Sequence, residues 1–129
     1  MNRGEPSADL ERFQRGQVNP AQFTHREHVR MAYEMLARYD FLDSAVRYTR
    51  GIQRLCERAG RPEKFHQTIT LASLSLIAER LATRPAGDFE SFAAANPDLL
   101  EPGALARWYR PQRLGSELAR RTFLLPDPR

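Results

Sequence analysis

The sequence predicts an all-α protein: a single compact helical bundle with three long helices and several short C-terminal helices. Apolar residues recur every three or four positions in three long segments, which is the period of one face of an α-helix. No alternating apolar and polar run is bounded by hairpin turns, so a β-sheet is not expected. Five of the nine prolines follow residue 96, and they restrict the C-terminal third to short helices.

The composition is that of one folded domain spanning residues 1–129, with residues 1–7 expected to fray. Hydrophobic residues make up 41% of the 129 residues, which is enough for a core without a disulfide or a structural metal. The single cysteine, Cys56, excludes an internal disulfide framework and favours the cytoplasm. No secretory signal or membrane-length apolar segment is present, so no membrane partner is expected.

The N-terminal part of the sequence predicts two helices. Residues 8–15 are expected to form a short helix that buries Leu10 and Phe13. A T-x-x-E capping box, Thr24 to Glu27, begins a long helix over residues 25–39. Phe23 precedes it at the staple position, opposite Val29 or a neighbouring side chain.

The second long helix is predicted over residues 44–59, after a connection over residues 40–43. Gly60 suits the position just past the helix C-terminus. The side chains expected on its buried side are Val46, Thr49, Ile52, Leu55, Cys56 and Ala59.

The third long helix is predicted over residues 63–81, and it is apolar on most sides, as expected of a central helix. The Pro-Ala-Gly segment at residues 85–87 ends it. Asp88 caps a short helix that reaches residue 95. Further short helices are expected over residues 103–109 and 116–123.

The three histidines carry the strongest functional signal. His25 and His28 lie three residues apart in one helical turn and share a face that continues into apolar residues, so both rings are expected to point inward. His66 lies near the start of the third helix, on the same face as Thr70. If these helices are neighbours, three imidazoles converge in the interior.

Three neutral imidazoles suit a divalent transition metal, Zn, Fe, Ni or Cu, and leave positions open for water and substrate. The leading hypothesis is therefore a metal-dependent hydrolase, lyase or oxygenase acting on a small organic substrate. His25, His28 and His66 would be the ligands, and Thr70 and Gln67 would orient the substrate. Thr70 is not favoured as a nucleophile, because its hydroxyl is expected to bond the carbonyl four residues earlier or the His66 ring. Glu27 would become a ligand only by leaving the capping box.

Two other interpretations stay open. The histidines could be structural, in a non-catalytic interaction or regulatory domain. Alternatively, neutral His28 and His66 could exchange a proton with substrate without a metal. The first turn of a helix lowers a histidine pKa and keeps the ring neutral, which fits each interpretation.

The sequence contains two further patterns, an arginine stripe and a Trp-Tyr pair. Four arginines form a stripe on one face of the second long helix, at Arg47, Arg50, Arg54 and Arg58. The formal net charge is only +4 and no aromatic residues alternate with the stripe, so a nucleic-acid partner is not favoured. Trp108 and Tyr109 would wall a pocket if the C-terminal segment crosses the helices.

The motifs F-T-H-R-E-H-V at residues 23–29 and K-F-H-Q-T-I-T at residues 64–70 resemble those of a group of small bacterial proteins with undescribed activity. The resemblance continues through N-P-D-L-L, the Trp108–Tyr109 pair, S-E-L-A-R and a final P-D. It implies an all-helical fold and the same histidines. The group usually has glutamate where this chain has Gln67, and Gln67 cannot take up a proton at neutral pH.

Overall fold

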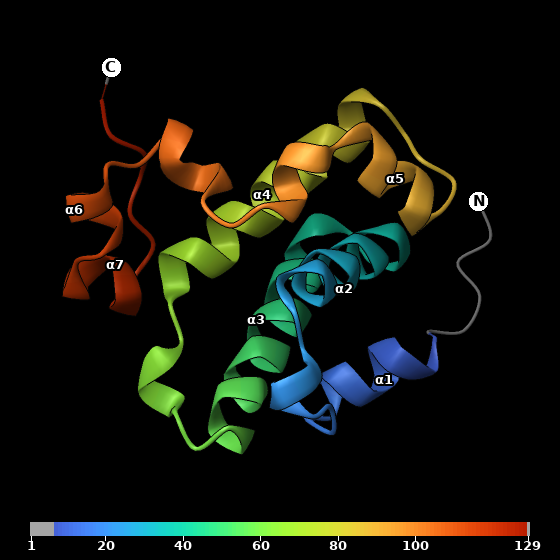
Figure 1. Cartoon of the computed structure of the whole chain (residues 1–129), viewed down its shortest axis with the longest axis horizontal. Helices are drawn as coiled ribbons and strands as arrows, with labels where there is room; N and C mark the ends of the chain where they lie inside the picture. Colours follow the sequence, from blue (N-terminus) through green and yellow to red (C-terminus); the bar gives the residue numbers. More distant parts are fainter. Residues whose placement is uncertain (1–6, 129) are drawn as a thin grey trace.

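The computed structural model describes residues 7–128, which form seven α-helices and four short 3-10 helices without a β-strand (Figure 1). This confirms the all-α prediction. The α-helices are α1 (Ala8–Gln14), α2 (His25–Arg38), α3 (Phe41–Arg58), α4 (Gln67–Thr83), α5 (Phe89–Ala95), α6 (Pro111–Leu114) and α7 (Glu117–Arg121). The 3-10 helices are η1 (Pro20–Gln22), η2 (Pro62–Lys64), η3 (Pro97–Leu100) and η4 (Ala104–Arg107).

Residues 1–6 lie outside the described residues, and so does most of the segment predicted to fray. Ser7 is described, and its hydroxyl accepts a hydrogen bond from the backbone N–H of Leu10 at the start of α1. Fraying is therefore wrong for Ser7.

Side-chain caps fix where the long helices begin. Thr24 caps α2 as predicted, accepting from the N–H of Glu27. Asp40 accepts from the N–H of Asp43, so α3 begins at Phe41 and not at residue 44. Because a carboxylate at this position satisfies a free N–H group, the predicted connection at residues 40–43 is mostly helix.

The start of α4 also differs from the prediction. Residues 62–64 form the separate turn η2, and α4 begins at Gln67 and not at residue 63. His66 lies just outside the helix as its N-cap, where its ring accepts from the N–H of Ile69. Histidine is not among the usual capping residues, so the sequence did not reveal this boundary.

The long helices α2, α3 and α4 pack against one another, and α1 packs against α2 and α3. In Figure 1, α6 and α7 lie at the opposite side of the molecule from α1, where α7 contacts α4. Leu10 and Phe13 are buried, as predicted for α1. The predicted buried side of α3 is partly wrong: Val46 is 61% exposed, and Tyr48 lies in the core.

The arginine stripe on α3 is largely used to hold α1 in place. The guanidinium groups of Arg54 and Arg58 donate to the carbonyls of Gln14 and Gly16, where α1 ends. Arg47 donates to the side chain of Gln14. These donors satisfy backbone and amide oxygens that a short helix leaves free at its C-terminus.

No helix among residues 7–128 combines the length and apolar character needed to cross a membrane.

Gly51 permits the close approach of α1 and α3. A Cβ atom at this position would lie 2.3 Å from Cε2 of Phe13. The Phe13 ring is fully buried, stacked on Phe23 and packed against Tyr48, so it has no free space into which to move.

We therefore expect Gly51→Ala to lower the free energy of unfolding by about 1–3 kcal/mol, because overpacking outweighs the gain of about 1 kcal/mol in helix propensity. Urea denaturation of the wild type and the variant measures this. Gly87→Ala is the control, because a Cβ at Gly87 meets no atom within 4 Å. A Gly51→Ala protein as stable as the wild type would show that α1 and α3 are not in this close contact.

Candidate functional site

All three histidines of the chain line one cavity of about 390 Å³ between α2, α3 and α4. All three isoleucines line it too, so its wall is mainly apolar. The residues of this histidine cavity are His25, His28, Val29, Tyr48, Ile52, Cys56, Lys64, His66, Ile69, Thr70, Ser73 and Ile77. The volume falls in the range of small-molecule sites.

His66 has both ring nitrogens engaged. Its Nδ1 accepts from the N–H of Ile69 at 3.1 Å, and its Nε2 donates to the carbonyl of Leu114 at 2.7 Å. A nitrogen that accepts from an N–H carries no proton, so these two bonds define the neutral tautomer protonated at Nε2. His66 thus connects the start of α4 to the end of α6.

His25 is engaged at one nitrogen. Its Nε2 donates to the carbonyl of Leu99 in η3, at 3.0 Å. The residue as a whole is exposed, so the prediction that its ring points wholly into the interior is wrong. The Leu99 carbonyl holds the ring along the rim of the cavity, because the helix begins at this residue and its side chain lies at the edge of the packed region.

His28 differs from the other two. Among the residues that the structure describes, its ring nitrogens have no hydrogen-bond partner, and neither nitrogen is completely shielded. The ring packs edge-on against Phe23, with centroids 4.7 Å apart. Phe23 therefore makes its staple contact with His28, a neighbour of the Val29 named in the prediction.

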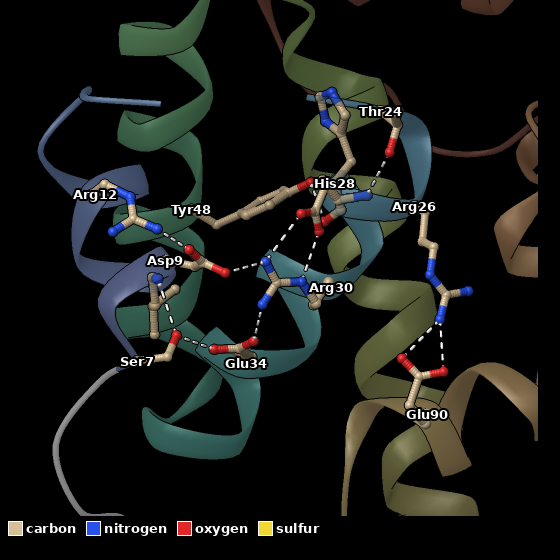
Figure 2. Close-up of polar contacts among 12 residues, drawn as sticks. Ser7, Asp9, Arg12, Thr24, Arg26, His28, Arg30, Glu34, Tyr48 and Glu90 are labelled. Atoms are coloured by element: carbon tan, nitrogen blue, oxygen red, sulfur yellow. Dashed lines mark hydrogen bonds and ion pairs between the residues drawn. The ribbon is translucent and has the colours of Figure 1, made fainter. Parts of the chain in front are cut away.

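Burial, together with the smaller effect of the nearby His25, lowers the pKa of His28 to about 4. The histidine is therefore neutral at pH 7. The prediction of a neutral ring rested on the helix dipole, whereas removal from water is the main cause here. In Figure 2 the imidazole of His28 points away from the charged cluster around Arg30.

That charged cluster explains why Glu27 does not face the cavity. Its carboxylate accepts from Arg30, at 2.7 and 3.0 Å, so the back-bond predicted for the capping box is replaced by an ion pair. Arg30 also binds Asp9 and Glu34, which joins α1 to α2 (Figure 2). The hydrogen bond from Arg30 keeps the pKa of Glu27 below its ordinary value.

Thr70 and Gln67 are placed differently. Thr70 lines the cavity, and its hydroxyl donates to the carbonyl of His66 at 2.7 Å, the helical back-bond that the sequence favoured over a nucleophilic role. Gln67 occupies the first position of α4 and is not part of the cavity wall.

Lys64, Tyr48 and Cys56 complete the polar part of the wall. The phenol of Tyr48 donates to the carbonyl of His28 at 3.3 Å, and burial raises the pKa of this phenol. Burial also raises the pKa of the Cys56 thiol. The sequence did not single out Lys64 or Tyr48 as site residues, although Lys64 is the only lysine of the chain.

A second cavity, of about 280 Å³, lies under the C-terminal segment and is walled by Trp108 and Tyr109, as predicted, and also by Phe123. Thr68 holds this segment in place: its hydroxyl donates to the carbonyl of Thr122 and accepts from the N–H of Leu124.

Within residues 7–128, no group of three or more His, Cys, Asp or Glu side chains is arranged to hold a metal ion. For the three histidines to coordinate one ion, His66 would have to give up one of its two hydrogen bonds. The metal site therefore stays a prediction.

Comparison of the chain with protein-family models, with curated proteins and with solved structures gives no match.

The lowered pKa of His28 makes stability depend on pH. The unfolded chain takes up a proton near pH 6.5, whereas folded His28 does so only near pH 4. The free energy of unfolding should therefore be constant above pH 6.5 with respect to this residue and decrease as the pH falls from 6.5 to 4, by roughly 3 kcal/mol.

Urea denaturation at several pH values, compared between the wild type and His28→Gln, isolates this contribution from that of the carboxylates. His25→Gln is the matched control and should keep most of the slope. An identical pH dependence in the wild type and His28→Gln would contradict the burial of a neutral imidazole.

Proposed function

We propose that the histidine cavity binds a small, mainly apolar organic molecule and that neutral His28 exchanges a proton with it, without a metal. One observation supports this proposal above the others: His28 is the cavity histidine whose ring nitrogens both lack a partner among the described residues. A partly buried imidazole without partners is a group with which a ligand can form hydrogen bonds.

The chemistry of His28 follows from its protonation state. A neutral imidazole has one N–H donor and one acceptor nitrogen, so it can take a proton from a bound molecule and return it at another atom. With a pKa near 4 the ring is in its proton-accepting form at neutral pH. The same low pKa makes it a weak base, which suits a transient transfer and not a lasting one.

The remaining groups serve as supports. The Tyr48 hydroxyl holds the backbone carbonyl of His28, which fixes the first turn of α2. The hydroxyl of Thr70 donates a hydrogen bond to the backbone carbonyl of His66, and its oxygen can accept one from a ligand. Gln67 lies away from the cavity, so we assign it no part in binding.

The apolar wall sets the class of ligand. Val29, Ile52 and Ile77 form much of it, and no carboxylate of the described chain belongs to it. Apolar surface buried on binding contributes about 25 cal/mol per Å², so a hydrocarbon part of the ligand would provide most of the affinity.

The metal-dependent enzyme remains the second candidate, because two histidines of α2 and the N-cap histidine of α4 line one cavity. It requires the ring of His66 to leave either Leu114 or Ile69. A role as a non-catalytic interaction domain would leave the free imidazole of His28 without a purpose.

Isoleucine labelling provides the test of ligand binding. All three isoleucine δ1-methyl groups belong to residues of this cavity; Ile69 and Ile77 also line a neighbouring cavity, so the signal of Ile52 distinguishes the two. In a screen of small organic fragments by NMR, we expect hits to shift these three signals together with the ring signal of His28. His28→Phe should remove the binding of polar hits. Hits that shift only signals elsewhere would contradict the proposal.

Metal titration separates the two candidates. We expect Zn²⁺, Ni²⁺, Co²⁺ and Cu²⁺ to bind the untagged wild type no more tightly than they bind His66→Ala, as measured by calorimetry. The wild type could instead bind one metal ion stoichiometrically, with His25→Ala, His28→Ala and His66→Ala each abolishing that binding. This result would replace the proton-transfer site by the metal site.

A further inference from the structure

The histidine cavity borders a neighbouring cavity of about 220 Å³. Five residues line both: His25, Val29, Ile69, Ser73 and Ile77. The two volumes therefore share a wall along one side of α4, and Ser73 lies where they meet. We call the neighbouring volume the leucine arm.

The leucine arm is more apolar than the histidine cavity. Beyond the shared wall it is lined by Leu76, Leu99, Gly103, Ala104, Leu105 and Leu114. No charged side chain takes part, and the carbonyls of Leu99 and Leu114 are already bound by His25 and His66. With its backbone acceptors engaged, the arm offers a ligand little beyond hydrocarbon contact.

The histidine cavity carries a positive charge at its exposed edge, on Lys64. Lys64 lines only the histidine cavity, and among residues 7–128 its ammonium group forms no ion pair or hydrogen bond. Its charge lowers the pKa of the Cys56 thiol, whereas the more strongly acting Glu57 and Glu63 raise it. The adjacent Glu63 is paired with Arg61. An anionic group at this end would therefore meet an available cation.

We propose that the ligand of the histidine cavity is a linear alkyl carboxylate, with its carboxylate near Lys64 and its chain extending past Ser73 into the leucine arm. This inference rests on the proposed function and specifies its ligand class; the proton that His28 exchanges would belong to a polar group carried on the chain, because an unsubstituted alkyl carboxylate has none that an imidazole can remove. A chain with one charged end matches the two volumes in polarity: cationic at one end and hydrocarbon at the other, with the histidine rings between them.

A bulky aromatic ligand fits less well. It would occupy the histidine cavity without using the leucine arm, and the Trp108 cavity offers it a larger aromatic wall. A cationic amine would meet Lys64 and find no carboxylate in either wall.

The test measures affinity for n-alkyl carboxylates of four, six, eight and ten carbons by calorimetry. We expect the affinity to rise about fourfold per added methylene, because each one is removed from water. Ser73→Phe places a ring where the two cavities meet and should abolish the increase beyond six carbons. Ser75→Phe is the matched control: Ser75 lies on the same helix but lines the Trp108 cavity.

The role of the charge is tested separately. Lys64→Met should weaken octanoate about threefold to fivefold and leave octanol unchanged, since an exposed ion pair contributes modestly. Arg84→Met is the control, because it removes the same charge from an exposed residue outside the wall. If Ser73→Phe fails to fold by circular dichroism, Ala104→Phe obstructs the arm instead, from a half-buried position.

The outcomes are distinct. A flat dependence on chain length, with ligands still shifting the signals of His28 and the isoleucines, would overturn the alkyl carboxylate and leave the proposed function standing. Binding reduced by Ser75→Phe and not by Ser73→Phe would place the ligand under Trp108 and also overturn it. The proposed function itself fails if no fragment or carboxylate moves those signals.

Discussion

The imidazole of His66 is the contact on which the arrangement of the site depends. One nitrogen caps the first turn of α4 and the other holds the carbonyl of Leu114. The ring thereby joins the start of α4 to the end of α6. Because an imidazole ring is rigid, holding it in place costs little conformational entropy. Since Thr70 and Ile69 follow directly in α4, their position in the cavity wall is set by the same ring.

The second constraint is the separation of charge from this interior. On α2 the carboxylates of Glu27 and Glu34 face Arg30, on the side joined to α1, and Arg26 pairs with Glu90 of α5. His28, one residue from Glu27, faces the apolar side. The helical period places adjacent residues about 100° apart, so a charged side and a neutral side coexist within one turn. The interior can therefore hold an uncharged imidazole.

The features that depend on contacts between residues close in the sequence were predicted correctly. Capping by Thr24 and Asp88, the burial of Leu10 and Phe13, and the back-bond of Thr70 all follow from contacts within a few residues. What depends on packing between segments was missed or wrong. Val46 is exposed while Tyr48 is buried, because the position of α1 and α2 around α3 decides which face is covered.

The site shows the same division. The three histidines were identified from their spacing, and the structure places them in one cavity wall. Their roles could not be predicted, because the partners Leu99 and Leu114 lie far away in the chain. Lys64 was not identified as a site residue, because its place in the cavity wall depends on the packing of helices that are distant in the sequence.

The contacts between α3 and the end of α1 have a consequence for natural sequence variation. Arg47 donates to an amide oxygen, places its guanidinium over the ring of Tyr39 and pairs with Asp43 at the same time, while Arg54 reaches a main-chain carbonyl. An exchange to lysine would preserve the isoelectric point and still lose the planar stacking and the multiple donors. Exchange of arginine for lysine should therefore be rarer on this face of α3 than at arginines that face solvent.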